Sequence, residues 1–263
     1  MQTYYRVLGE TTILSSGWKP VSMVDVYQRV TFTLWTCGCN LKCPFCHNWR
    51  LAVNDPSVCR RIETSSILEE LESAKILIDY IHITGGEPLV QYKAIEALLR
   101  TVKENIGVMT SLNTNFTIHQ PLARMINEGI IDHVATDAKI PPTLLYGYPP
   151  VIAETLWRLY KKTLKLITDT GTPLELRIPV PRNIDWKTYT RYLEELLSIL
   201  DGHDTFYVIV QPLVGPPITD PRDREWCREY CDPPKTVLEK IAGTLRSHGV
   251  ENIVVRDSLA FET

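Results

Sequence analysis

Two hydrophobic periodicities alternate along this chain. Short runs rich in β-branched and aromatic residues predict strands, and stretches whose apolar residues recur every three or four positions predict helices. The predicted strands are 29–35, 80–84, 108–112, 131–136, 174–180 and 206–211, and the predicted helices are 66–78, 92–103, 120–127, 153–168 and 186–200. Ser66-Ile67-Leu68-Glu69 has the form of a capping box, which predicts the start of the first helix. Strands that alternate with helices imply a parallel sheet covered by helices.

The ends of the chain carry weaker signals. Residues 1–27 predict a small cap or hairpin, 212–221 a Pro-rich loop, 234–248 a helix and 251–256 a last strand. About six β/α units precede the Pro-rich loop, which suits an α/β fold of the incomplete (β/α)6 barrel type. We therefore expect one domain over residues 1–263, with a core at about 23–211, an N-terminal cap at 1–22 and a C-terminal extension at 212–263.

Composition narrows the classes of function. Apolar residues make up 44% and charged residues 22%, as in ordinary globular proteins. A net charge of -3 gives no electrostatic footprint for nucleic acid, although a local basic patch stays open. No apolar run approaches the roughly 20 residues of a membrane span, and residues 1–6 lack a signal-peptide core, so we expect no membrane association and a cytoplasmic location. The odd count of seven cysteines fits metal chemistry in a reducing compartment better than disulfides.

Cys39, Cys43 and Cys46 follow a predicted strand at a C-x3-C-x2-C spacing. This spacing curls the loop so that three thiolates converge on one point. Iron–sulfur clusters normally take four cysteine ligands, so three would leave one iron open to bind and activate a small molecule. The alternative is a zinc site that uses the same cysteines with His47, because Cys3His is a known zinc ligand set.

A second motif, Gly85-Gly86-Glu87-Pro88, lies at the carboxyl end of the next predicted strand. Glycines let the backbone come close to a ligand, and the carboxylate that follows suits the amino group of a bound amino acid. Taken alone, the motif could also be an ordinary turn.

Together the two motifs resemble the radical S-adenosylmethionine (SAM) superfamily. That resemblance implies a [4Fe–4S] cluster on Cys39, Cys43 and Cys46, with SAM chelating the fourth iron through its amino and carboxylate groups. The run Cys43-Pro44-Phe45-Cys46-His47-Asn48 also resembles the Cys-x-Tyr/Phe-Cys-His-Asn of activating enzymes for pyruvate formate-lyase and anaerobic ribonucleotide reductase. The similarity runs from about residue 23 to residue 211.

Near the cluster, the resemblance places Phe45 on the SAM adenine, and its alternative role is that of an aromatic in the loop core. His47 and Asn48 match the activating-enzyme signature, and their alternative is structural support of the cluster.

Toward SAM, the resemblance implies that Gly85, Gly86 and Glu87 bind the methionyl end, with Glu87 supplying charge or holding the loop. Asp137 and Lys139 match an Asp-x-Lys at the end of the fourth strand that contacts the amino acid and ribose of SAM; the alternative is a surface ion pair.

Arg177 lies within the fifth predicted strand and could face the barrel lumen and pair with the SAM carboxylate. Its alternatives are a solvent-facing side chain and a structural ion pair.

Two positions depart from the family pattern. Asn113 stands where related activating enzymes have an aspartate, so a cation site built on that aspartate is not expected. Gln211 stands where formate-lyase activators have a histidine, and it could supply a neutral hydrogen bond there.

The four remaining cysteines are Cys37, Cys59, Cys227 and Cys231. Cys227 and Cys231 are too few for an auxiliary cluster, and no further cysteine pair stands nearby, so structural or free thiols are expected.

The resemblance implies a function in which a radical generated from SAM abstracts hydrogen from a backbone glycine of a partner glycyl-radical enzyme. It also implies an electron donor of flavodoxin or ferredoxin type. Two alternatives stay open: a radical SAM enzyme for another target, such as a deazaguanine precursor, a tRNA or a peptide, and a zinc- or cluster-stabilised binding protein without catalysis.

Overall fold

A computed structural model describes residues 11–203 and 205–256, and its contacts divide the chain into two compact units. The first unit contains the chain up to Asn40 with Arg50–Thr114 and Gln120–Val134. The second unit contains Leu41–Trp49, Asn115–His119 and the chain from Ala135 onwards. The single domain expected over residues 1–263 remains a prediction.

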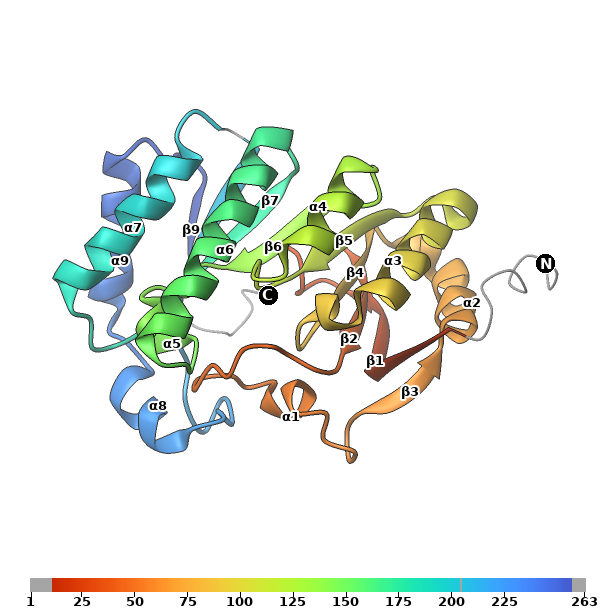
Figure 1. Cartoon of the computed structure of the whole chain (residues 1–263), viewed down its shortest axis with the longest axis horizontal. Helices are drawn as coiled ribbons and strands as arrows, with labels where there is room; N and C mark the ends of the chain where they lie inside the picture. The colour runs from red at the N-terminus through yellow and green to blue at the C-terminus, as the bar shows by residue number, and fades with distance from the viewer. Residues whose placement is uncertain (1–10, 204, 257–263) are drawn as a thin grey trace. The chain divides into compact units, whose positions relative to one another are not determined.

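Strands and helices alternate through most of the described chain (Figure 1). The strands are β1 (Thr12–Ser22), β2 (Thr31–Thr36), β3 (Arg60–Glu63), β4 (Tyr80–Gly85), β5 (Met109–Asn113), β6 (His133–Asp137), β7 (Leu174–Val180), β8 (Phe206–Pro212) and β9 (Ile253–Val255). The helices are α1 (Trp49–Ala52), α2 (Thr64–Ala74), α3 (Tyr92–Thr101), α4 (His119–Asn127), α5 (Pro142–Leu145), α6 (Pro150–Thr170), α7 (Trp186–Leu200), α8 (Arg224–Tyr230) and α9 (Lys235–Ser247). The predicted α/β class with parallel strands is confirmed, and it is consistent with the incomplete (β/α)6 barrel.

In the first unit the strand order is β3-β1-β2-β4-β5. β1 runs antiparallel to β2 and β3, whereas β2, β4 and β5 run parallel. The register places Thr36, the last residue of β2, opposite Gly85, the last residue of β4. The cysteine segment and the glycine motif therefore leave the sheet from neighbouring strand ends. Within the predicted cap or hairpin of residues 1–27, the structure has one strand, β1, which pairs with β2; the first ten residues lie outside the described residues.

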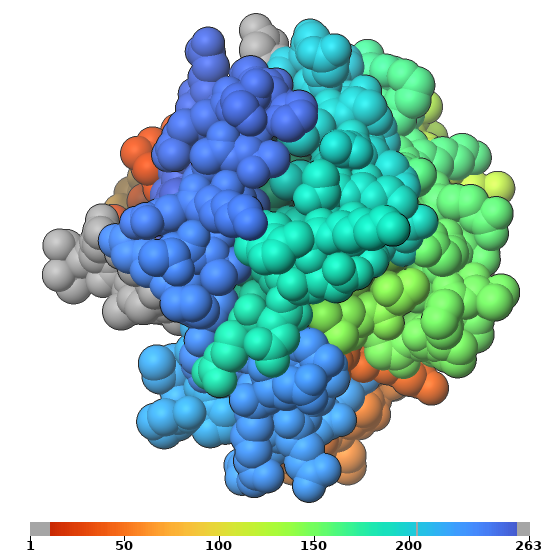
Figure 2. All heavy atoms as spheres, turned by 90° about the vertical axis from the view of Figure 1, so that its left-hand side faces the viewer, coloured from red at the N-terminus to blue at the C-terminus, as the bar shows by residue number. Residues whose placement is uncertain are grey.

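In the second unit the strand order is β6-β7-β8-β9, and β8 runs parallel to β7 and β9. Figure 2 shows α7 and α9 side by side on one face of this unit, with α8 beyond one end of the pair. α7 buries residues at helical spacing, namely Tyr189, Tyr192, Leu193, Leu196, Leu197 and Leu200. That spacing is why both the existence and the bounds of α7 could be predicted from periodicity.

The predicted start of α2 at a capping box is wrong. The helix begins at Thr64, and Ser66 lies inside it. Pairing of β3 with β1 determines this start, because the N–H and the hydroxyl of Thr64 both donate to the carbonyl of Thr11, each over 3.0 Å. Hydrogen bonding to a segment distant in the chain thus determines where this helix starts, and the local capping motif does not.

β3 and α8 were not expected from the sequence. β3 has four residues, of which only Ile62 is buried, so it shows no alternation. α8 lies in the predicted C-terminal extension and buries only Cys227. It is nevertheless capped, because the Asp223 carboxylate accepts a 2.9 Å hydrogen bond from the N–H of Trp226.

Candidate active site

Cys39, Cys43 and Cys46 lie outside the disulfides of the described chain. Cys43 is buried, and the other two are partly exposed. Cys39 belongs to the first unit, whereas Cys43 and Cys46 belong to the second. The described residues include no group of three or more His, Cys, Asp or Glu side chains arranged to hold a metal ion, so convergence of the three thiols stays a prediction. The donor set itself fits a [4Fe–4S] cluster, because it offers thiols from a single short segment.

Two disulfides correct the expectation of free thiols, because Cys37 pairs with Cys59 and Cys227 with Cys231. The partners lie 22 and 4 residues apart, and neither spacing forms a recognisable framework in the sequence.

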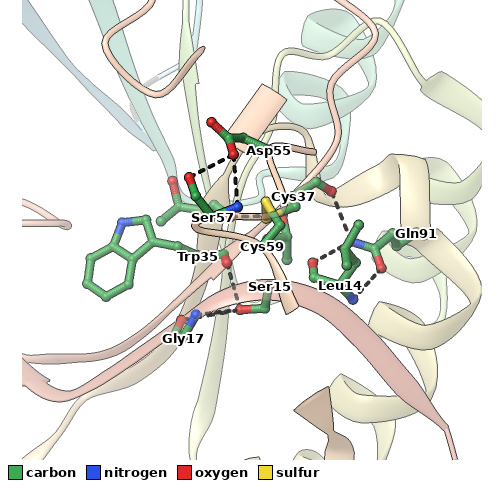
Figure 3. The surroundings of a disulfide bond; sticks show 11 residues. Leu14, Ser15, Gly17, Trp35, Cys37, Asp55, Ser57, Cys59 and Gln91 are labelled. Atoms are coloured by element: carbon green, nitrogen blue, oxygen red, sulfur yellow. Dashed lines mark hydrogen bonds between the residues drawn. A yellow bond between two sulfur atoms is a disulfide. The ribbon is translucent and has the colours of Figure 1, made fainter. Parts of the chain in front are cut away.

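The Cys37–Cys59 disulfide holds the segment that leads into Cys39 (Figure 3). The N–H of Cys37 donates to the carbonyl of Leu14 over 2.9 Å, and the carbonyl of Cys37 accepts from Gln91 over 3.0 Å. Gln91 also bonds both main-chain groups of Leu14, so one side chain ties β1 to the end of β2.

The glycine motif is hydrogen-bonded to the cysteine segment within the first unit. The N–H of Gly86 donates to Thr36, and the N–H of Glu87 donates to Gly38, over 2.8 and 2.7 Å. A Cβ on Gly86 would lie 2.1 Å from the Gly38 carbonyl oxygen, and one on Gly85 would lie 2.4 Å from that of Thr36. Both glycines are therefore required for close packing of two backbone segments. The proposed contact of this motif with SAM stays a prediction.

Glu87 is fully buried and holds its own loop. Its carboxylate accepts hydrogen bonds from the N–H of Leu89 over 3.1 Å and from the hydroxyl of Thr114 over 2.7 Å. These bonds favour the loop-holding role over the alternative of supplying charge. Nearby, the Asn113 side-chain amide donates to the hydroxyl of Thr84 over 2.9 Å, so the ends of β4 and β5 are linked by neutral groups.

Within the second unit, burial raises the pKa of the Cys46 thiol above its ordinary value. The charge of Arg222 and a hydrogen bond from the Asn48 backbone offset this rise only in part. Burial also lowers the pKa of His47, so its imidazole is neutral at neutral pH. A positive charge and an N–H beside a sulfur stabilise a thiolate, which is the form that binds iron.

Phe45 packs at the base of the same loop. Its ring lies 6.2 Å from that of Trp226 and contacts a buried apolar cluster that includes the Cys227–Cys231 disulfide. This contact is what a loop-core aromatic would make, and the proposed stacking on adenine remains untested.

Asp137, the last residue of β6, brings together Lys139 and Arg177, which lies within β7. Its carboxylate lies 2.9 Å from each cation, and Arg177 also pairs with buried Glu175 over 3.2 Å. Lys139 and Arg177 are only 10% and 12% exposed, so this is not a surface ion pair. Although burial disfavours its charge, Lys139 and Arg177 hold the pKa of Asp137 well below its usual range. Gln211, in β8, is paired with Pro179 of β7, and its proposed contact with the cofactor stays a prediction.

Arg222 and Trp226 were missed by the sequence analysis. Both come from a Pro-rich segment and a short helix without apolar periodicity, so no local signal pointed to them. Both touch the cysteine loop: the N–H of Arg222 donates to the Cys46 carbonyl over 3.0 Å, and the ring of Trp226 lies against that of Phe45. The N–H of Asp223, between them in the chain, donates to the Pro44 carbonyl over 2.9 Å.

The model of the radical SAM superfamily matches residues 33–196, which is more than half of the chain. The chain belongs to this superfamily. Membership implies a [4Fe–4S] cluster and SAM as cofactors, as predicted.

Curated relatives include activating enzymes. A candidate glycyl-radical enzyme activating enzyme of Methanocaldococcus jannaschii is 31% identical over 126 residues, which cover 48% of this chain and 50% of that protein. The pyruvate formate-lyase-activating enzyme of Staphylococcus aureus strain USA300 is 35% identical over 91 residues, which cover 32% of this chain and 34% of that enzyme. The matches thus span half or less of the curated relatives.

Solved structures share the fold at low identity. Streptococcus suis SuiB bound to S-adenosylmethionine superposes with a TM-score of 0.55 and 16% identity, covering 83% of this chain and 48% of that one. SuiB bound to its precursor peptide SuiA gives the same TM-score at 15% identity, covering 83% of this chain and 46% of that one. Among the helices of the described residues, none has the length and apolarity of a membrane span.

Proposed function

We propose that this protein is a glycyl-radical enzyme activating enzyme. The observation that carries the proposal is the set of three thiols outside the disulfides, Cys39, Cys43 and Cys46, in a chain whose curated relatives are named as activating enzymes. Cys39, Cys43 and Cys46 would hold the cluster, which together with SAM would supply a radical able to abstract a hydrogen atom from a backbone glycine of the partner enzyme.

The chain's own residues prepare this chemistry. The charge of Arg222 and the hydrogen bond from the Asn48 backbone partly offset the burial that disfavours the thiolate of Cys46. Glu87 holds the loop that follows β4, which keeps the strand end in place for the amino acid part of SAM. Asp137 fixes Lys139 and Arg177 as a preorganised charged group beside the end of β6, suited to the polar groups of SAM.

The partner's glycine must reach the radical, so its loop has to leave its own core. We therefore expect a weak complex before SAM binds, because ordering a mobile segment opposes association. A flavodoxin or ferredoxin-type protein is the proposed electron donor.

The test is electron paramagnetic resonance of the anaerobic, cluster-loaded protein with dithionite, SAM and each glycyl-radical enzyme of the source organism. We expect a doublet on the partner, because one α-hydrogen remains on the glycyl carbon. The signal should disappear in the matched Cys43→Ala variant and when the partner's glycine is replaced by alanine. If SAM is cleaved to 5′-deoxyadenosine on a small molecule, RNA or peptide and no partner gains a glycyl radical, the proposed function is wrong.

A further inference from the structure

A continuous row of hydrogen bonds within the second unit links five side chains, here called the polar row: Tyr207, Glu175, Arg177, Asp137 and Lys139. The Tyr207 hydroxyl donates to Oε2 of Glu175 over 2.6 Å, and Nη1 of Arg177 donates to Oε1 of the same carboxylate over 3.2 Å. Nε of Arg177 donates to Oδ1 of Asp137, and Nζ of Lys139 donates to Oδ2, each over 2.9 Å. Each of the two carboxylates therefore bridges two donors.

The polar row follows from strand geometry. Glu175 and Arg177 are two residues apart on β7, so their side chains lie on the same face of the sheet. Tyr207 is directly paired with Glu175 in the register of β7 and β8. The N–H of Ala138, next to Asp137, donates to the Arg177 carbonyl over 2.7 Å, which holds the end of β6 against β7. The fold thus brings residues from three strands into one row.

The polar row becomes more exposed towards the carboxyl end of β6. The exposed fraction of the side chain rises from 1% at Glu175 to 12% at Arg177 and 27% at Asp137. In β/α folds, sites form at the carboxyl ends of the strands. A ligand therefore reaches the row at Asp137, and Glu175 and Tyr207 lie behind Arg177.

Glu175 and Asp137 hold different nitrogens of one guanidinium. Because the guanidinium is planar, anchoring both Nε and Nη1 fixes its plane as well as its position. The Tyr207 hydroxyl holds the Glu175 carboxylate, so it acts on Arg177 through Glu175. Removing this hydroxyl leaves every charge of the polar row in place, which separates positioning from charge balance.

We propose that Glu175 and Tyr207 are positioning residues that set the affinity for SAM by fixing the orientation of Arg177. The inference rests on the SAM cofactor of the proposed function. Arg177 is a cation suited to the SAM carboxylate, and a guanidinium that is already fixed loses less conformational freedom on binding than a mobile one. Glu175 thus contributes to binding through geometry as well as through charge.

The test is calorimetric titration of SAM into the anaerobic, cluster-loaded protein, with the cluster oxidised so that SAM is not cleaved. We expect Tyr207→Phe to keep its iron and sulfide but to bind SAM on the order of fivefold more weakly, because a hydrogen bond to a charged group no longer holds Glu175. Glu175→Ala should weaken binding further. Glu175→Gln keeps an acceptor for Arg177 and should recover part of the affinity.

Nitrogen-15 NMR of the arginine side chains measures the mobility of Arg177 in the absence of SAM. In the wild type the Arg177 Nε–H is bonded to Asp137, so its exchange with water should be slow. Tyr207→Phe should speed this exchange, and Arg177→Lys identifies the signal by its loss.

Tyr192→Phe is the matched control. The Tyr192 hydroxyl also donates to a carboxylate, that of Glu154, but this bond joins α7 to α6. The substitution removes a hydrogen bond of the same kind from the fold. It should leave both the SAM affinity and the Arg177 exchange unchanged.

Three results would overturn the inference: an unchanged SAM affinity in Tyr207→Phe, an equal loss of affinity in Tyr192→Phe, or an unchanged exchange of the Arg177 Nε–H in Tyr207→Phe. A wild type that forms the cluster but binds no SAM would overturn both the inference and the proposed function. If the wild type binds SAM and no partner gains a glycyl radical, the proposed function alone fails, so the two failures are distinguishable.

Discussion

At the scale of single residues, Asp137 and Glu175 form a largely buried ionic group with Lys139 and Arg177, in which two carboxylates face two cations. Asp137 contacts two cations, and Glu175 balances the second charge of the group through Arg177. A group of this kind is sensitive to the loss of one member, because the remaining charges stay buried. Its position beside the end of β6 also makes it a candidate for contact with SAM, so stability and binding should both depend on it.

We predict that Asp137→Asn lowers the free energy of unfolding at pH 7 by about 3 kcal/mol, because Lys139 and Arg177 lose their shared counter-charge. The pKa of Asp137 is lower in the folded than in the unfolded state. Its stabilisation is therefore complete above the unfolded pKa of about 3.9 and is lost as the pH falls through the folded value. Urea unfolding at several pH values should show that the variant loses less stability than wild type below about pH 4.

Asp169→Asn is the control for this prediction. Asp169 is half exposed and pairs only with Lys165, one turn away on α6, over 2.9 Å. Removing such a surface pair should change stability by less than about 0.5 kcal/mol. If both substitutions lowered the free energy of unfolding by the same amount, the Asp137 group would contribute no more to stability than a surface ion pair.

At the scale of elements, the carboxyl ends of β2 and β4 pack directly against each other. Thr36 is paired with Gly85, and the two N–H bonds from Gly86 and Glu87 continue the contact beyond the strands. The second glycine of the motif lies against the carbonyl of Gly38, next to Cys39. A substitution in the glycine motif should therefore shift the backbone of the cysteine segment and also weaken the binding of any ligand at the motif.

We predict that Gly86→Ala displaces the segment before Cys39, since the added Cβ would lie 2.1 Å from a backbone oxygen that no side-chain rotation can move. Both the iron content after anaerobic reconstitution and the affinity for SAM measured by calorimetry should fall. A variant with full iron and unchanged affinity would contradict this. Gly243→Ala, in helix α9, is the control, because nothing lies within 4 Å of its Cβ position and alanine favours a helix.

At the scale of the whole molecule, seven cysteines divide into three thiols and two disulfides among the residues that the structure describes. Each disulfide lies within one of the two units. Cys37 stands two residues before Cys39 in the chain, and the Cys227–Cys231 disulfide belongs to the apolar cluster that Phe45 contacts. Neither disulfide uses a thiol that the cluster needs.

We predict that the anaerobically reconstituted protein holds about four irons per chain. Cys39→Ala, Cys43→Ala and Cys46→Ala should each abolish the cluster, because each removes one of three thiolate ligands. The double variant Cys227→Ala and Cys231→Ala should retain it. Iron, sulfide and zinc analysis measures the outcome, and a colourless protein with stoichiometric zinc would contradict it.

The sequence by itself determined the features that depend on local order. The apolar periodicities of α7 and β7 predicted their bounds, because side-chain direction repeats regularly along a helix or strand. The spacing of Cys39, Cys43 and Cys46, with Gly85-Gly86-Glu87 after the next strand, led to the superfamily in the same way. Each of these signals spans only a few consecutive residues, so it can be recognised without knowing the fold.

Only the tertiary structure decided the contacts between segments that are distant in the chain. It paired Cys37 with Cys59, placed Gly38 against Gly86, and brought Arg222 to Cys46 from a segment without periodicity. In each case the partner depends on how separate elements pack, and no residue pattern near either member encodes it. The same physical reason moved the start of α2 away from its capping box, because strand pairing across the sheet outweighed a local preference.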